Sequence, residues 1–409
     1  MATIKMYNVE FGESILVSKR DERTHLDKGL LIDCGTRCSL KTYPTIFEPI
    51  RKDLLPLDEK KLMITHFHED HICGLYTFLN SNPVHFNRVY LPDLFDTDHY
   101  LLDLVLLKYY LQNALKQRNS RQPFDYWTLI CKFISSHTQI TLLRKGNTFK
   151  AASRDWNVYW PEAVPDDLTP YIIQRIEAGL IDIIDNREEV LRQVQAILEK
   201  AHHTADCLSE LVREYSREDT EEPNEPEINE EIWVEEKENI DNLINELLDL
   251  PLSQNFFKSN LKRNLLTFIT GKENEYSIVC DSDLNNNKRF LFTGDVTPNV
   301  LEETIIPQLL ELGYGPYFCI KAPHHGTALF YTDDLSQLSP RVILISNGVP
   351  YYSGTEITDQ YIKNTESTIF CTNGTSCPKS KRGPLKKKCL FSSCPLTHFC
   401  FQGLISFNV

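Results

Sequence analysis

Three histidines and an aspartate occur within six residues, at His66, His68, Asp70 and His71. They directly follow the apolar run 62–64, which predicts a buried strand that ends just before them. Their spacing fits neither the helical period of 3.6 nor the strand period of 2, so this is no amphipathic pattern. A tight loop after the strand would let His66 and His68 bind one ion, while Asp70 and His71 bind a second from the start of the next helix. We therefore predict a metal site here rather than a polar surface loop that happens to be rich in histidine.

The surrounding sequence predicts the elements that must position these side chains. Short apolar runs bounded by turn residues predict strands, and apolar residues spaced three or four apart predict helices. The expected strands are two within 3–18 that meet near 10–13, and then 30–33, 62–65, 89–92, 140–149, 156–160, 265–269, 277–281, 290–293, 317–322, 342–346 and 403–409. The expected helices are 40–54, 74–79, 98–118, 172–201, 204–215, 232–250 and 299–312. This alternation predicts a layered α/β core.

Further segments resemble one family of proteins. The motif at 66–71 resembles the signature of the metallo-β-lactamase superfamily of metal-dependent hydrolases. Its neighbours resemble, more narrowly, the hydrolase domain of bacterial DNA-uptake competence proteins. The segments that carry the resemblance, in the same order, are 7–17, 31–35, 66–71, 274–279, 290–295 and 321–327. The resemblance implies an α/β fold of the metallo-β-lactamase type, an αββα sandwich.

An acidic helical block interrupts this resemblance. Between Glu214 and Glu238 there are twelve acidic residues against two basic ones, so this stretch contributes −10 of the net charge of −14. We predict residues 1–164 and 252–409 as the two halves of the hydrolase domain, with 165–251 as an α-helical insertion. The insertion is either a lid, a specificity element or a docking surface for a protein partner, or a decoration that covers the edge of the sheet.

The resemblance also assigns roles to residues outside the motif. Asp295, after Gly294, matches the carboxylate that bridges two metal ions, and His325 matches the remaining ligand of the second ion. His324 is then expected to face the substrate, where it contacts a phosphate oxygen or gives a proton to the leaving group. His324 and Asp70 are the predicted catalytic residues. The alternative for this histidine pair is one ligand and one histidine satisfied within the core.

The predicted ligand set is His66, His68, Asp70, His71, Asp295 and His325, holding two divalent ions. Zinc and manganese both suit these nitrogen and oxygen donors. Ordinary members of the superfamily place a further histidine on the first ion, between the motif and the bridging aspartate. Five histidines lie in that interval without a matching motif: His85, His99, His137, His202 and His203. The competence-type branch also lacks this ligand, so the first ion is expected to keep open positions for water or substrate.

The resemblance implies a two-metal phosphodiesterase or nuclease. In the expected mechanism, a hydroxide that bridges the ions attacks a phosphodiester of DNA or RNA, and the ions stabilise the developing charge. One alternative is a hydrolase of a small phosphodiester such as a cyclic nucleotide. Another is an effector subunit whose hydrolase is activated by a partner protein. The segment after 343–346 lacks the histidine that competence-type domains usually carry there, so any role of that residue is in doubt.

The rest of the composition limits location and partners. No run of about 18 apolar residues occurs and the start has no secretory pattern, so we expect a cytoplasmic protein without a membrane contact. Without a secretory signal, twelve cysteines indicate thiols or metal ligands rather than disulfides. Five of them crowd the C-terminal segment beside the lysine- and arginine-rich stretch 379–388. That stretch either guides a nucleic-acid strand or is a solvated loop, and the cysteines either hold a structural zinc or stay free.

Overall fold

The structure is a computed structural model of the whole chain. It describes residues 2–80, 83–94, 105, 106, 108, 126–162, 187–216, 230–249, 260–284, 288–348, 357, 358, 360, 361, 366–372, 398–400 and 404–408. These residues form two compact units. The first unit contains 1–92, 141–162 and 274–409, and the second contains 93–140 and 163–273.

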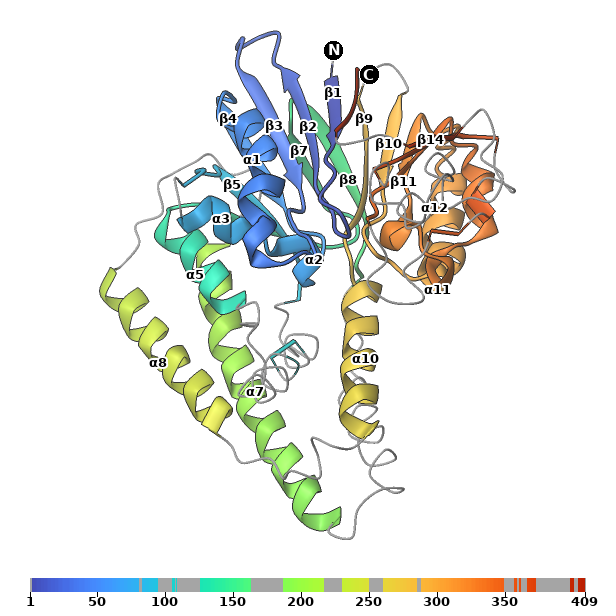
Figure 1. Cartoon of the computed structure of the whole chain (residues 1–409). Helices are drawn as coiled ribbons and strands as arrows, with labels where there is room; N and C mark the ends of the chain where they lie inside the picture. Colours follow the sequence, from blue (N-terminus) through green and yellow to red (C-terminus); the bar gives the residue numbers. More distant parts are fainter. Residues whose placement is uncertain are drawn as a thin grey trace. The chain divides into compact units, whose positions relative to one another are not determined.

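The first unit is built on two sheets, which Figure 1 shows facing each other. The first sheet has seven strands in the order β15-β1-β2-β3-β4-β5-β6. Their bounds are β1 Ala2–Met6, β2 Ile15–Arg20, β3 Asp27–Ile32, β4 Glu59–Met63, β5 Arg88–Pro92, β6 Gln139–Leu143 and β15 Ile405–Asn408. β15 pairs antiparallel with β1, so the two ends of the chain share one sheet edge, and β3, β4 and β5 run parallel.

The second sheet has eight strands in the order β14-β13-β12-β11-β10-β9-β8-β7. Their bounds are β7 Thr148–Ala151, β8 Arg154–Trp160, β9 Val279–Asp283, β10 Arg289–Phe292, β11 Cys319–Lys321, β12 Val342–Ile345, β13 Thr368–Cys371 and β14 His398–Cys400. β7 to β10 are antiparallel, whereas β10 to β14 are all parallel. The loops that follow β10, β11 and β12 therefore leave the same edge of the sheet.

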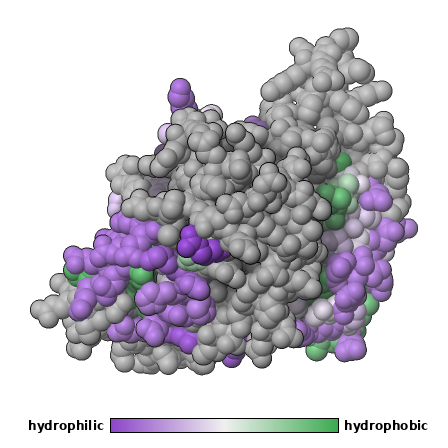
Figure 2. Space-filling view, turned by 90° about the horizontal axis from the view of Figure 1, so that it is seen from below, coloured by the Kyte–Doolittle hydropathy of each residue, from purple (hydrophilic) through white to green (hydrophobic). Residues whose placement is uncertain are grey.

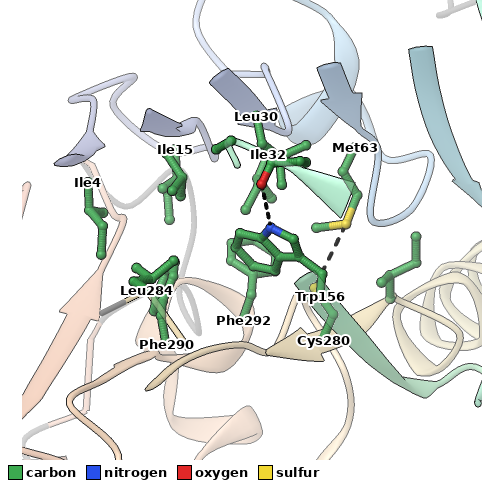
Figure 3. Packing of buried hydrophobic residues seen from close by; sticks show 14 of the residues in the cluster. Ile4, Ile15, Leu30, Ile32, Met63, Trp156, Cys280, Leu284, Phe290 and Phe292 are labelled. Atoms are coloured by element: carbon green, nitrogen blue, oxygen red, sulfur yellow. Dashed lines mark hydrogen bonds between the residues drawn. The ribbon is translucent and has the colours of Figure 1, made fainter. Parts of the chain in front are cut away.

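A continuous apolar core lies between the two sheets (Figure 3). Alternate residues of each strand point into it, for example Leu30 and Ile32 of β3 and Phe290 and Phe292 of β10. Trp156 is fully buried there, and its indole Nε1 donates a hydrogen bond to the carbonyl of Ala151 at 3.2 Å. The spacing of two between buried residues is the reason that the strand predictions from sequence located these elements.

Helices cover the outer faces of both sheets. Beside the first sheet lie η1 (Leu40–Thr42), α1 (Tyr43–Leu54), α2 (Glu69–Ile72) and α3 (Leu75–Asn80). α1 buries one side, including Phe47 and Ile50. The outer face of the second sheet packs against α11 (Pro298–Val300), η2 (Leu301–Ile305), α12 (Ile306–Glu311) and η5 (Asp333–Leu338). Short 3₁₀ turns η3 (Pro323–Gly326) and η4 (Ala328–Phe330) follow β11. These layers form the predicted αββα sandwich.

The second unit is helical in its described part. Its helices are α5 (Tyr126–Ser135), α7 (Arg187–Tyr215), α8 (Glu230–Asp249) and α10 (Asn260–Glu275), whose last two residues belong to the first unit. α7 packs against both α5 and α8. Figure 2 shows mainly hydrophilic residues on the left, where α7 and α8 lie. No described helix combines the length and the apolarity that crossing a membrane requires.

The structure corrects three predictions from sequence. The stretch 140–149, expected as one strand, forms β6 and β7, which belong to different sheets. Residues 265–269, expected as a strand, lie inside helix α10. A five-residue stretch with four apolar residues is compatible with either structure. Here Ile269 and Glu273 are buried four residues apart while Thr267 is exposed, which is helical spacing. The break expected between the helices 172–201 and 204–215 is absent, because α7 continues from Arg187 to Tyr215; residues 172–186 of the first expected helix lie outside the described residues.

Some predictions fall outside the described residues. Of the helix expected at 98–118, only residues 105, 106 and 108 are described, and they are helical. The basic stretch 379–388 and three cysteines, Cys377, Cys389 and Cys394, are not among the described residues. The other two C-terminal cysteines, Cys371 and Cys400, are register partners on β13 and β14. The boundaries of the proposed insertion stay a prediction.

Candidate metal centre

The ends of three strands bring the predicted ligands together in the first unit. His66 and His68 follow β4, and His68 is the N-cap residue of α2, which carries Asp70 and His71. Asp295 follows β10. All of these side chains are buried, although each is polar or charged. Polar groups buried without compensation are unfavourable, so a cluster of this kind indicates a specific site.

Two glycines let the backbone fit around this cluster. Gly35 lies against α2, and a Cβ at this position would come within 2.2 Å of the carbonyl carbon of Asp70. Gly294 has a φ of +53° and a Cβ there would lie 2.7 Å from Ser277 Cβ. Any larger residue at either position would displace the segment that carries a predicted ligand.

The Oδ2 atom of Asp295 is the centre of the cluster. It lies 3.1 Å from His71 Nε2, 3.6 Å from His325 Nε2, 3.8 Å from His324 Nε2 and 4.0 Å from His66 Nε2. Burial raises the pKa of Asp295, but the neighbouring histidines and Lys321 outweigh this effect and hold it well below its usual range. Asp295 is therefore a carboxylate at neutral pH.

The ligand atoms fall into two groups that can each hold a metal ion. One group is His66, His71 and Asp295, and the other is Asp70, His71 and His325. Within each group the ligand atoms lie within 4.8 Å of one another. The donors are imidazole nitrogens and carboxylate oxygens, the set that suits zinc and manganese.

His325 provides a direct test of whether a metal fits. Its Nδ1 lies 3.0 Å from the carbonyl oxygen of Ser346, which fixes the proton on Nδ1 and leaves Nε2 with a lone pair. Nε2 is buried, has no hydrogen-bond partner in the described part of the chain, and lies 3.4 Å from Asp70 Oδ2. An unpartnered acceptor nitrogen facing two carboxylates is the arrangement expected of a metal ligand.

Asp33 orients His71 in the same way. Its Oδ2 lies 2.7 Å from His71 Nδ1, and both of its oxygens also accept hydrogen bonds from Thr65, at 2.8 Å from the backbone and 2.7 Å from the hydroxyl. Burial lowers the pKa of His71, but Asp295 and Asp33 outweigh it and raise the pKa well above the usual value. His71 Nε2 therefore faces Asp295 Oδ2, at 3.1 Å, on the side away from Asp33.

A buried lysine balances part of the negative charge. Lys321 Nζ is 3.0 Å from Glu13 Oε2 and 3.3 Å from Asp295 Oδ1, and it donates to the carbonyl of Gly294 at 2.8 Å. Burial lowers the pKa of Lys321, but Glu13 and Asp295 outweigh it and raise the pKa above its ordinary value. Lys321 thus stays charged and ties β11 to both the N-terminal hairpin and the loop of Asp295.

Two predicted residues lie beside the groups rather than in them. His68 belongs to neither group, although its Nδ1 is 2.9 Å from His66 Nε2. His324 is partly exposed, at 21 % of its side chain, and its ring stacks on Phe330 with centroids 3.8 Å apart. Its Nδ1 lies 2.9 Å from the Thr327 hydroxyl, so Nε2 is the atom that faces Asp295.

Sequence reasoning missed four charged residues of the site. These are Glu13, Asp33, Arg37 and Lys321. Arg37 donates a hydrogen bond to Asp70 Oδ1 at 3.0 Å, and its side chain is 28 % exposed. Three of them stand in segments whose resemblance to the family was noted: 7–17, 31–35 and 321–327. A charged residue next to a buried strand was the available signal, because such a group requires a buried partner.

One comparison, a family model, agrees with this geometry at the level of the superfamily. Residues 22–107, which include the motif, match the family model described as the metallo-beta-lactamase superfamily. Among solved structures, the chain is similar to a beta-lactamase domain protein from Burkholderia ambifaria, with 17 % identity and a TM-score of 0.24. That similarity covers 39 % of this chain and 47 % of the other, so the chain spans about half the length of that protein. The search of curated proteins found no match. The family match and the αββα fold support a metal-dependent hydrolase; the competence-type resemblance stays a prediction.

Proposed function

We propose that this protein is a two-metal phosphodiesterase that cleaves DNA or RNA. The observation that carries the proposal is the position of Asp295 Oδ2 among four imidazoles, within reach of both groups of ligand atoms. A carboxylate shared by two neighbouring ion sites is the arrangement on which two-metal hydrolysis depends.

The two groups share His71 and do not include His68, so the division of ligands between the two ions follows the family resemblance. We propose His66 and His68 for the first ion, with Asp70, His71 and His325 for the second and Asp295 shared between them. Two divalent ions held in this way would lower the pKa of a water molecule and neutralise the charge that develops on a phosphodiester. Asp33 and the carbonyl of Ser346 keep His71 and His325 in the tautomer whose Nε2 faces the site.

Two partly exposed side chains are proposed to contact the substrate. Burial lowers the pKa of His324 to about 3, so its imidazole is neutral at pH 7. A neutral His324 whose Nδ1 accepts a hydrogen bond from Thr327 carries its proton on Nε2, and can donate it to a phosphate oxygen or to the leaving group. Arg37 keeps its charge at the surface beside Asp70, where it favours an anionic substrate.

The test is a nuclease assay on labelled single-stranded DNA, double-stranded DNA and RNA with Mn²⁺ or Zn²⁺. Asp70→Ala and His71→Ala proteins are compared with Glu69→Ala, which removes a carboxylate from the same helix but from neither group. We expect metal-dependent cleavage by the wild type and the Glu69→Ala protein, and loss of about a hundredfold or more in the other two, because each removes a ligand.

Metal content is measured on the same samples. A protein that binds no metal would contradict the central proposal. A protein that binds two ions but cleaves none of the polymers would contradict the choice of nucleic acid, and a small phosphodiester such as a cyclic nucleotide would be the next substrate tested.

A further inference from the structure

A cavity with a cationic lining lies in the first unit, away from the metal centre. It has a volume of about 570 Å³. The lining side chains that matter for its chemistry are Lys288, Arg289, Tyr314, Pro316, Phe318 and Arg341. They come from the starts of β10, β11 and β12 and from the loop that follows α12 (Figure 1).

The direction of the strands separates this cavity from the metal centre. β10, β11 and β12 run parallel, and the metal-site residues Asp295 and His325 follow the ends of the first two. The cavity lies at their beginnings, where Phe318 N donates to the carbonyl of Arg289 at 3.0 Å. β10 and the start of the loop after it separate the cavity from Asp295. Because a strand rises by about 3.3 Å per residue, the cavity and the metal centre lie on the order of 10–20 Å apart.

Three cations line the cavity, and no acidic residue is among the described residues that line it. Arg341 is exposed and has no ion-pair partner among the residues that the structure describes. Lys288 also lacks an ion pair within that part of the chain, and its Nζ lies 5.5 Å from the centre of the Phe318 ring. Arg289 is different, because its charge is compensated by Asp281 at 2.8 Å and its guanidinium covers the Tyr314 ring at 3.7 Å.

Two uncompensated cations at one cavity are unexpected in a chain whose net charge is −14. An ammonium and a guanidinium are the groups that hold phosphate most strongly, the latter by paired hydrogen bonds. Pro316 and Phe318 add apolar surface beside them. Small-molecule sites combine a mainly apolar wall with a few polar groups that fix one end of the ligand.

We propose that this cavity binds a small organic phosphate. The phosphate group lies between Lys288 and Arg341, and the organic part lies against Pro316 and Phe318. The site is distinct from the one proposed for hydrolysis, and it shares no residue with it. Binding here does not depend on whether the metal centre cleaves phosphodiesters.

The experiment uses phenylphosphonate, whose phosphorus–carbon bond is not a phosphodiester. Its binding to the full-length, metal-containing protein is measured by isothermal titration calorimetry. Inorganic phosphate supplies the charge without the ring, and benzyl alcohol supplies the ring without the charge. The variants are Arg341→Gln and Lys288→Gln, and the matched control is Arg20→Gln, an arginine of β2 that is 66 % exposed.

We expect phenylphosphonate to bind more tightly than either fragment. Loss of one charge-assisted hydrogen bond predicts an affinity about tenfold or more lower in Arg341→Gln and in Lys288→Gln, and no change in Arg20→Gln. The thermal unfolding temperature of each variant shows that it is folded. Affinity equal to that of the wild type in both cavity variants would place binding at the metal centre and overturn the proposal. Benzyl alcohol binding as tightly as phenylphosphonate would overturn it as well. A third result would also overturn the proposal: phenylphosphonate does not bind, while a single-stranded oligonucleotide binds and the Arg341→Gln substitution weakens its binding.

Discussion

The carboxylate of Asp281 is the most heavily hydrogen-bonded buried charge of the second sheet. It is fully buried on β9. Arg289 donates to it from Nε and from a terminal nitrogen, both at 2.8 Å. Asn157 Nδ2 donates at 3.1 Å, and the hydroxyls of Tyr159 and Tyr317 donate at 2.9 and 2.8 Å. Five donors therefore converge on two oxygens.

Replacing Asp281 with asparagine preserves the shape and removes the charge. One acceptor oxygen becomes an NH₂ donor that faces other donors, and Arg289 loses its counter-charge. Removing one partner of a buried ion pair typically destabilises a protein by about 3–5 kcal/mol. Arg289 is 18 % exposed, so water compensates part of the loss and we expect the lower end, about 3 kcal/mol. For a domain of this size that lowers the unfolding temperature by about 6–12 °C.

The assay is thermal unfolding followed by circular dichroism, with Glu48→Gln as the control. Glu48 forms an ion pair with Arg51 at 2.9 Å, but it is 39 % exposed on α1. Exposed pairs of this kind contribute little to stability because water screens both charges, so the control should unfold within about 3 °C of the wild type. An Asp281→Asn protein that also unfolds within about 3 °C of the wild type would refute the reasoning.

Three further predictions concern the metal centre and the buried thiols. Asp33→Asn should weaken metal binding about 10–100-fold, because His71 loses the acceptor that fixes its tautomer. Competition with a chelator measures the metal affinity, and an unchanged affinity would contradict the role of Asp33 in orienting His71. Burial raises the pKa of the Cys319 thiol well above its ordinary value, so iodoacetamide should modify Cys38 in the native protein and leave Cys319 unmodified, as peptide mass spectrometry would show. Burial raises the pKa of Cys73 from 9.0 to about 12, so the folded state retains a proton that the unfolded state loses. Its contribution to stability is complete below pH 9 and is lost as pH rises toward 12. A Cys73→Ala protein should therefore lose less stability between pH 8 and 10.5 than the wild type in urea titrations, and parallel losses would exclude this thiol.

The local part of the metal site could be predicted from the sequence because its ligands are neighbours in the chain. His66, His68, Asp70 and His71 lie on one loop and one helical turn, so their spacing alone restricts what they can bind. The alternation of apolar runs predicted the layered α/β core, and the resemblance to a family supplied the αββα arrangement. Residues 265–269 were misassigned because five residues, four of them apolar, are too few to distinguish the helical period from the strand period.

The distant part of the site depended on tertiary structure. His71 and Asp295 are 224 residues apart in the chain, and in the folded protein His71 Nε2 lies 3.1 Å from Asp295 Oδ2. From the sequence, only the resemblance to a family indicated that these two residues belong to one site. The buried pair of Glu13 and Lys321 had no counterpart in any sequence pattern, because neither residue restricts the other locally.

Residue type and spacing thus determined which chemistry this protein carries: imidazole and carboxylate donors on a short loop after a buried strand. The packing of the two sheets decided which donors lie close enough to share an ion, which nitrogen of His325 faces the cluster, and that Lys288 and Arg341 line one cavity. The physical reason is that spacing in sequence fixes geometry only within a few residues, whereas contacts between strand ends depend on the register and direction of every strand between them.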